Sequence, residues 1–354
     1  MGSLLFLLAG TLVVTGGILW FGSSFLIQPQ RRPLEARHYE LLEGPEEFGL
    51  SLESHTVVTS DGTRLDTLLA TRSLTPGKAT RTRGMTERLR NQGFISHSTP
   101  RGTLVLLHGR GGIKENLLYV AQRFVAADFR CIVYDARAHG KSTGAYCTFG
   151  KREVQDLEAV LSYYRNRLGE RDERIGPVGA FGNSLGAAVV LQSLENFSSD
   201  SPRIEAAVAV APFASLPEIV VNAGQKKIHR HLPPELIHAS MHLGGWRAGF
   251  RPFSISPLAS TARSRTPLFL THGRLDGVIP IQHSHQIRDA SQASPLVWRE
   301  VPDGYHSNVL ATGGDDLYEE MLLFYLENLG APSGKNRRAE TSFHQASLYG
   351  VAMR

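Results

Sequence analysis

Three polar residues have the types, and the order along the chain, that nucleophilic catalysis requires. Ser184 lies in the stretch GNSLG, Asp276 in THGRLDGVIP and His306 in VPDGYHSN. A serine hydroxyl is a weak nucleophile at neutral pH, so it needs a histidine to accept its proton and a carboxylate to orient the imidazole. The sequence therefore predicts a catalytic triad of Ser184, His306 and Asp276, provided that the fold brings them together.

The surroundings of Ser184 favour a nucleophile over an ordinary turn. GNSLG fits the pattern G-x-S-x-G, which by itself is weak because glycine-rich chains contain it by chance. Here an apolar run typical of a strand (PVGAF) precedes it, and a helical pattern (LGAAVVLQSLENF) follows it. A serine on a sharp strand-to-helix turn needs this context, with small residues where strand and helix approach each other. A plain turn between strand and helix is the less favoured interpretation.

A glycine-rich stretch offers the donors for an oxyanion hole. LLHGRGG ends another apolar run, and its backbone N–H groups can turn toward a developing alkoxide. One donor is expected to be the N–H of Leu185, directly after the nucleophile, and the other that of Arg110, with Gly109 and Gly111 as alternatives. The Arg110 side chain is expected to face solvent, although near the pocket it could attract an acidic group of a substrate.

Other candidates have weaker claims to these roles. Asp135 ends the run CIVYD and competes with Asp276 as the acid, whereas Asp303 is expected to shape a turn. Histidines that precede a glycine at a strand end are expected to make structural hydrogen bonds: His108, His139 and His272. No cysteine or histidine cluster has the spacing of a metal site, so neither metal nor organic cofactor is expected. The four histidines of the segment 214–266 are interpreted as surface residues.

The elements that must position these residues alternate between strands and helices. Residues 55–72 indicate two extended segments around the turn Asp61-Gly62. Short continuous apolar runs then indicate buried strands at 103–109, 131–135, 177–181, 206–211, 267–273 and 296–301. Helical spacing lies between or after them, at 116–128, 152–168, 185–197, 283–290 and 315–329. This alternation predicts an α/β fold with a mostly parallel sheet covered by helices on both faces.

Several segments fall outside this alternation. Residues 214–266 are rich in His, Pro and Gly and are expected to form a small helical cap over the carboxyl ends of the strands. Residues 77–101 are basic and weakly periodic, and they are interpreted as a long surface insertion, with contact to lipid headgroups as the alternative. The end of the chain, 331–354, is expected to be a loose tail.

The N-terminal residues favour a membrane anchor. Residues 4–27 are uncharged and predominantly apolar, long enough as a helix to cross a bilayer. A cleaved signal peptide is less favoured because no basic residue precedes the run and no clear cleavage site follows. We therefore expect a transmembrane anchor over 1–30 and a juxtamembrane linker over 31–54. Arg31, Arg32 and Arg37 favour a single-pass protein with its catalytic domain in the cytoplasm.

From about residue 54 to 329 the chain resembles the α/β-hydrolase superfamily, in its esterase/lipase and serine-peptidase branch. The resemblance rests on H-G-x-G-G at 108–112, D-x-R-x-H-G-x-S at 135–142, GNSLG, and the Asp276 and His306 loops. It implies an α/β-hydrolase domain over 55–330, with Ser184 as nucleophile, Asp276 as acid and His306 as base. One departure is Ala138, where relatives often have glycine, in a turn outside the triad.

Composition and charge limit the remaining possibilities. The net charge is +5, but no aromatic residues interleave with the basic clusters, so a membrane surface is a likelier partner than nucleic acid. The two cysteines, Cys131 and Cys147, are interpreted as free thiols, with a bridge between them as the alternative. The sequence thus predicts a serine hydrolase acting on a carboxylic ester, which the anchor would make a lipophilic or acyl-lipid one. Peptide or amide hydrolysis, acyl transfer and a non-catalytic membrane-tethered scaffold are the alternatives, and the oligomeric state stays open.

Overall fold

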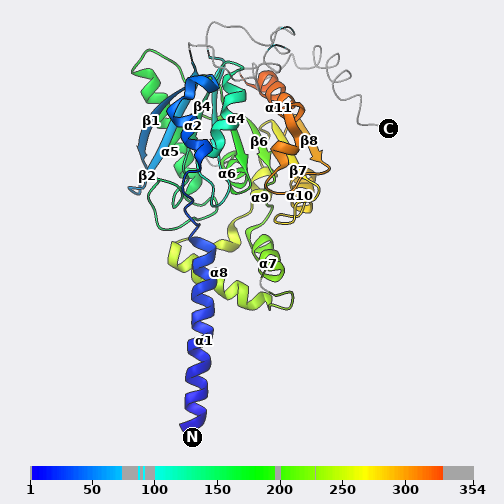
Figure 1. Cartoon of the computed structure of the whole chain (residues 1–354). Coiled ribbons are helices and arrows are strands. Elements are labelled where there is room, and N and C mark those ends of the chain that lie inside the picture. Colours follow the sequence, from blue (N-terminus) through cyan, green and yellow to red (C-terminus); the bar gives the residue numbers. More distant parts are fainter. Residues whose placement is uncertain are drawn as a thin grey trace, which may run out of the picture.

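The chain folds around one eight-stranded sheet (Figure 1). This computed structural model describes residues 2–73, 87, 91, 100–195, 201–227 and 229–329. The strand order is β1-β2-β4-β3-β5-β6-β7-β8. The pairs β1–β2 and β2–β4 are antiparallel, and the other five neighbouring pairs are parallel. The strands are β1 Leu50–Val58, β2 Arg64–Arg72, β3 Gly102–Leu107, β4 Phe129–Tyr134, β5 Val178–Asn183, β6 Ile204–Val210, β7 Leu268–Gly273 and β8 Leu296–Val301. The predicted mostly parallel sheet is confirmed.

Helices cover both faces of the sheet, so the central strands are apolar without alternation. In β3, Val105 and Leu107 face one core, while Leu104 and Leu106 face the other. The first core includes α5 Glu153–Gly169, α6 Leu185–Ser193 and α10 Gln282–Ala290. The second includes α2 Ala36–Glu43, α4 Glu115–Val125 and α11 Val309–Asn328. Burial on both faces is the reason that these strands read as continuous apolar runs.

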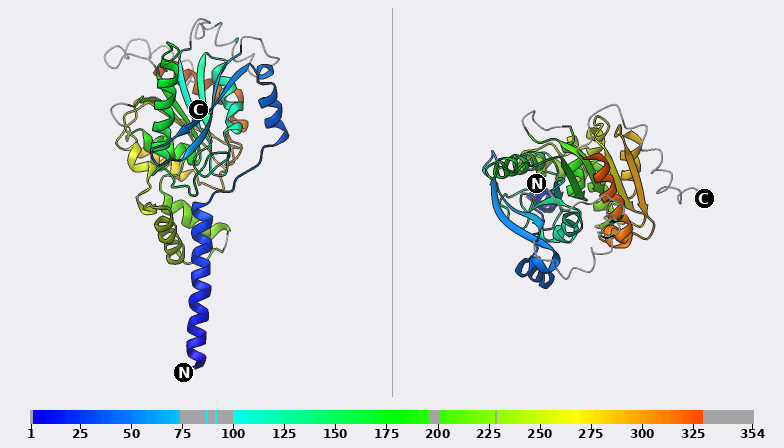
Figure 2. Two further views of the ribbon diagram at one scale, coloured as in Figure 1. Left: turned by 90° about the vertical axis from the view of Figure 1, so that its left-hand side faces the viewer. Right: turned by 90° about the horizontal axis from the view of Figure 1, so that it is seen from above.

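The segment predicted as a cap forms three α-helices and a 3₁₀ turn. They are α7 Leu216–Lys227, α8 Pro234–Ala248, η2 Pro252–Ser254 and α9 Pro257–Thr261. Figure 2 shows α7 and α8 grouped beside the end of α1, whereas α9 lies closer to the sheet and packs on α6. This arrangement fits the expected excursion between β6 and β7.

The N-terminal helix α1, Gly2–Ile27, projects from the body of the molecule (Figure 1). Over the residues whose side chains are described, no helix combines the length and the apolar character needed to cross a membrane. The predicted anchor over 1–30, and with it the single-pass placement, is therefore not supported. Two apolar residues of the last turn of α1, Leu26 and Ile27, are buried in the core that includes α8.

Other predicted boundaries differ in detail. The segment 31–54, expected as a linker, contains α2, the 3₁₀ turn η1 Pro45–Phe48 and the first residues of β1. The hairpin around Asp61-Gly62 is present, but β1 begins at Leu50, earlier than expected. Most of the basic insertion 77–101 and the whole tail 331–354 lie outside the described residues.

Candidate active site

The serine predicted as nucleophile lies on a sharp turn between β5 and α6. Ser184 has φ 55° and ψ −114°, a backbone conformation that residues other than glycine rarely adopt. The turn is possible because its glycines allow close approach. A Cβ on Gly182 would lie 2.4 Å from the carbonyl carbon of Gly186, and one on Gly186 would lie 2.2 Å from the carbonyl oxygen of Leu107. The strained turn thus holds the hydroxyl at the carboxyl edge of the sheet.

The two partners predicted for Ser184 arrive from the ends of β7 and β8. The Nε2 atom of His306 is 3.0 Å from Ser184 Oγ, and its Nδ1 atom is 2.6 Å from Asp276 Oδ2. The side chain of His306 is 20% exposed and that of Asp276 is fully buried. The structure therefore brings all three predicted residues into one hydrogen-bonded chain, in the geometry that proton transfer from a serine to an imidazole requires.

Asp276 is held by four hydrogen bonds. Its Oδ1 accepts from the backbone N–H groups of Val278 and Ile279, both at 2.8 Å. Its Oδ2 lies near His306 and also 3.1 Å from Nε2 of a second histidine, His272. Although burial alone would raise it, the hydrogen bonds from the two histidines hold the pKa of Asp276 well below its usual range. The carboxylate is therefore ionised and fixed in orientation.

His272 is a neighbour of Asp276 that the sequence analysis did not connect with the triad. Its Nε2 is also 2.9 Å from the carbonyl of Ile279, and its Nδ1 is 2.7 Å from the hydroxyl of Ser284. Asp276 thus contacts two histidines that each lie beside a serine: His306 with Ser184, which is partly exposed, and His272 with Ser284, which is buried. The only sequence signal was the spacing of four residues between His272 and Asp276 within the same strand end and loop.

The residues predicted for the oxyanion hole lie around Ser184. Leu185 is the first residue of α6, where backbone N–H groups have no acceptor inside the helix. The turn that contains Arg110 is closed by the N–H of Gly112 donating to the carbonyl of Gly109 at 2.9 Å. A Cβ on Gly109 would lie 3.2 Å from that of Ser184, so this turn passes directly beside Ser184. The Arg110 side chain, expected in solvent, instead contacts the end of α1.

Asp135, the competing candidate for the acid, has other partners. Its Oδ1 accepts the backbone N–H of Lys114 and its Oδ2 that of Lys141, both at 2.8 Å. Oδ2 is also 3.2 Å from the Lys114 ammonium, which is 2.7 Å from Glu115 and 2.8 Å from Asp66. Although burial would raise it, Lys114 holds the pKa of Asp135 below its usual value. Asp135 therefore belongs to a buried ion cluster in the scaffold.

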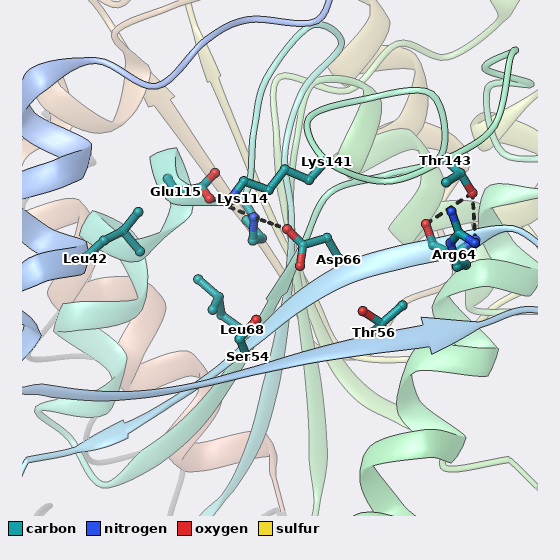
Figure 3. Close-up of a pocket in the computed structure, with 10 residues that line it drawn as sticks. All are labelled: Leu42, Ser54, Thr56, Arg64, Asp66, Leu68, Lys114, Glu115, Lys141 and Thr143. Atoms are coloured by element: carbon teal, nitrogen blue, oxygen red, sulfur yellow. Dashed lines mark hydrogen bonds and ion pairs between the residues drawn. The ribbon is translucent and has the colours of Figure 1, made fainter.

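A cavity of about 440 Å³ lies beside this ion cluster. Figure 3 shows the residues that line it. Asp66 and Lys114 contact each other across it, and Thr143 hydrogen-bonds the backbone of Arg64 at one side. None of Ser184, Asp276 and His306 lines this cavity. The cavity is therefore separate from the hydrogen-bonded chain that leads to Ser184.

The remaining histidines and the cysteines have structural surroundings. His108 accepts the N–H of Ala136 at 3.0 Å, and His139 lies 2.9 Å from the carbonyl of Arg137. Cys131 and Cys147 are buried free thiols. Ala138 has φ 63°, which explains why glycine suits this turn better than alanine. Within the described part of the chain, no group of three or more His, Cys, Asp or Glu side chains could hold a metal ion.

Comparisons with known proteins agree with this architecture. Residues 98–242 match the family described as serine aminopeptidase, S33. The chain is 27% identical over 235 residues to the uncharacterised protein YqkD of Bacillus subtilis, covering 66% of this chain and 73% of that protein. It is 24% identical over 233 residues to a monoacylglycerol lipase of Mycolicibacterium smegmatis, covering 58% of this chain and 81% of the lipase.

Solved structures extend the comparison to the fold. The esterase Pf2001 of Pyrococcus furiosus superposes with a TM-score of 0.60 at 20% identity, covering 85% of this chain and 98% of the esterase. The chain therefore has the α/β-hydrolase fold, as its sequence motifs implied. Together, the family match and the lipase and esterase similarities support a hydrolase.

Proposed function

We propose that this protein is a serine hydrolase that cleaves a carboxylic ester. Ser184 attacks the ester carbonyl while His306 takes its proton, and Asp276 orients the imidazole and stabilises its charged form. The backbone N–H groups of Leu185 and Arg110 stabilise the alkoxide oxygen of the tetrahedral intermediate. His306 then returns the proton to the departing alcohol, and water, activated by the same histidine, releases the acid from Ser184.

The observation that carries this proposal is the continuous chain of hydrogen bonds from Asp276 to Ser184. The distances of 2.6 Å and 3.0 Å are short enough for direct proton transfer without a bridging group. The strained backbone of Ser184 supports the same role, because strain at a buried turn is kept where it orients a reacting group. No further group is needed to activate the serine in this mechanism.

The exposed residues beside the triad support a substrate with an apolar portion. Leu275 and Val278 flank Asp276 in sequence and are 44% and 43% exposed. Tyr305 precedes His306 and is 55% exposed. Large apolar side chains left exposed on loops that carry catalytic groups favour binding of an apolar acyl or alcohol group. The similarity to a monoacylglycerol lipase points in the same direction.

The second candidate function is hydrolysis of a peptide or amide bond by the same groups. The observation that favours it is the match of residues 98–242 to a family described by an aminopeptidase. An amide differs from an ester in its leaving group, and the triad can protonate either one. Acyl transfer to an acceptor other than water, or a non-catalytic scaffold, would also retain this fold.

Covalent labelling and a substrate panel test these possibilities. A fluorophosphonate probe is expected to label the wild-type protein at Ser184 and to leave Ser184→Ala unlabelled. Equal weak labelling of the two proteins would contradict an enzymatic role and favour a scaffold. p-Nitrophenyl esters of increasing acyl length are then compared with aminoacyl anilides, and faster cleavage of the anilides would replace esterase with peptidase. Addition of alcohols, with analysis of the products, detects acyl transfer.

A further inference from the structure

The last residues of the N-terminal helix and those that follow it pack against the edge of the sheet that carries Ser184. We name Phe25–Arg32 the N-terminal strap. Ile27 is fully buried, and its carbonyl accepts the N–H of Cys147 at 2.8 Å. The Arg31 guanidinium donates to the carbonyl groups of His139 at 3.1 Å and Ser142 at 2.8 Å. The strap is therefore tied to the connection between β4 and α5, near the carboxyl ends of the strands.

The turn that carries the proposed oxyanion donor lies between the nucleophile and this strap. On one side, a Cβ on Gly109 would be 3.2 Å from the Cβ of Ser184. On the other side, a Cβ on Gly111 would be 3.7 Å from the carbonyl oxygen of Gln30. The position of the turn is thus set by groups on both sides, and the strap is one of the two.

The Arg110 side chain makes the direct connection from the turn to the strap. Its guanidinium donates to the carbonyl of Phe25 and, at 3.2 Å, to that of Leu26, and it lies 5.5 Å from the centre of the Phe25 ring. These carbonyls belong to the last turn of α1, where no N–H group of the helix is available to them. This end of the helix is also the negative end of its dipole. A cation that donates two hydrogen bonds is well suited to this position.

The same end of α1 is also fixed to the cap. Arg247 of α8 donates to the hydroxyl groups of Ser23 at 2.6 Å and Ser24 at 2.8 Å, and lies 3.7 Å from the centre of the Trp20 ring. A Cβ on Gly244 would lie 3.2 Å from Ile27, so α8 and α1 are in close contact. The end of α1 therefore offers Arg110 a support that is itself held by the cap.

We propose that the side chain of Arg110 is a positioning residue for the oxyanion hole. It holds the 109–112 turn against the last turn of α1, so that the backbone N–H of Arg110 stays directed at the position of the developing alkoxide. This inference rests on the proposed function of Ser184. It makes the N-terminal helix part of the catalytic architecture and not a separate attachment.

Substitution of Arg110 separates its side chain from its backbone. Arg110→Met keeps the N–H and much of the apolar stem but cannot donate to the two carbonyls. Removal of an oxyanion donor costs about 10²–10³ in kcat, so a displaced donor is expected to cost about tenfold. The KM for a p-nitrophenyl ester is expected to change less than threefold, because ground-state binding is not the interaction lost. Arg110→Lys, with one cationic donor, should recover part of the loss.

A readout of the turn itself complements the kinetics. Hydrogen exchange at the amides of 109–112 is expected to be faster in Arg110→Met than in wild type, with a similar melting temperature. The matched control is Arg167→Met in α5, which loses only a surface ion pair with Glu170 and should leave kcat and exchange unchanged. Phe25→Ala provides a milder change, removing the ring below the guanidinium while keeping the carbonyl, and should reduce kcat by a smaller factor.

These measurements can overturn the inference in two ways. Wild-type kcat and wild-type exchange in Arg110→Met would show that the contact does not position the turn. If Arg110→Met does not fold, wild-type kcat in both Arg110→Lys and Phe25→Ala would lead to the same conclusion. Failure of the proposed function looks different, because wild-type protein would then not react with fluorophosphonate, while the exchange comparison would still report on the turn.

Discussion

Asp135 and Asp276 occupy similar places in the fold but have different partners. Asp135 follows β4 and Asp276 follows β7, and both are buried at the carboxyl edge of the sheet. Asp135 accepts hydrogen bonds from two backbone N–H groups and contacts the Lys114 ammonium. Asp276 also accepts two backbone hydrogen bonds, but its second oxygen contacts His306, which reaches Ser184.

Burial and position do not by themselves distinguish the aspartate proposed as the acid of the triad from the one in the scaffold. Both carboxyl groups have a pKa below the usual value, despite burial that would raise it, because cationic or N–H donors surround them. The Lys114 ammonium contacts three carboxylates, so its charge is balanced within the scaffold. The imidazole of His306 is partly exposed and can pass a proton onward. The partner of each carboxylate therefore distinguishes the catalytic role proposed for Asp276 from the structural role of Asp135.

The largest expected effect comes from Asp276→Asn. The amide would no longer stabilise the charged imidazole or favour the productive tautomer of His306, so kcat is expected to fall about 10⁴-fold. Steady-state kinetics with a p-nitrophenyl ester measures this loss. Asp303→Asn, an exposed change in the His306 loop, is the matched control and should retain activity. A loss of less than tenfold in Asp276→Asn would mean that Asp276, like Asp135, has only a structural role.

Asp135→Asn should lower the free energy of unfolding and leave kcat nearly unchanged. It leaves the buried Lys114 ammonium with less compensation, and breaking such a pair costs about 3 kcal/mol of unfolding free energy. Urea denaturation measures the loss, and kcat per folded molecule is expected to stay within a few-fold of wild type. Asp66→Asn removes a more exposed partner of the same ammonium and should cost less. A stable Asp135→Asn protein with a collapsed kcat would reverse the roles assigned to the two aspartates.

The sequence predicted that the loops of Ser184, Asp276 and His306 would lie together because their signals are local. Ser184 was identified from the strand before it and the helix after it, and Asp276 and His306 from their places after later strands. Parallel strands bring such positions to one edge of a sheet, so a one-dimensional pattern suffices to group them. The buried strand predicted at 103–109 was recognisable from its continuous apolar run, and β3 lies there.

The sequence did not predict contacts that depend on packing between distant segments. The carbonyls that Arg110 contacts are more than 80 residues away, and a backbone carbonyl leaves no trace in residue types. Likewise, Leu26 and Ile27 are apolar whether they face lipid or a protein core, so hydropathy alone favoured a membrane anchor. His272 could not be connected with Asp276 because strand and loop geometry decide whether residues four apart meet.

The second contact on Asp276 gives a finer test of what its partners contribute. His272→Phe removes the N–H near Asp276 Oδ2 and leaves the Ser284 hydroxyl and Ile279 carbonyl without this partner. We expect about a tenfold loss of kcat and about 1–2 kcal/mol of stability, since buried polar groups lose hydrogen bonds. Ser284→Ala, which removes only the distant hydroxyl, should lose stability with near-normal kcat. Equal kcat losses in both variants would contradict an orienting role for His272.

The last prediction concerns acid stability and a neutral histidine near Asp276, with no change in kcat expected at neutral pH. His283 is buried, and its Nδ1 accepts the N–H of Ala214 at 3.3 Å, which requires an unprotonated Nδ1. Burial, together with nearby His272 and opposed by Asp276, lowers the pKa of His283 to about 4. Glu218, 3.7 Å away, is the facing carboxylate on the cap. Unlike Asp276, this side chain is therefore expected to remain uncharged in the folded protein.

Because the unfolded chain binds a proton to His283 near pH 6.5 and the folded chain near pH 4, stability is lost as the pH falls through this window. The full contribution is about 3 kcal/mol, from about 1.4 kcal/mol per pKa unit. His283→Gln removes this titration, so its unfolding free energy should fall less between pH 6.5 and 4 than that of wild type. His242→Gln, on the exposed surface of α8, should retain the wild-type pH dependence. If His283→Gln keeps it as well, the acid sensitivity comes from the other buried histidines, His108 and His139, whose pKa values burial also lowers.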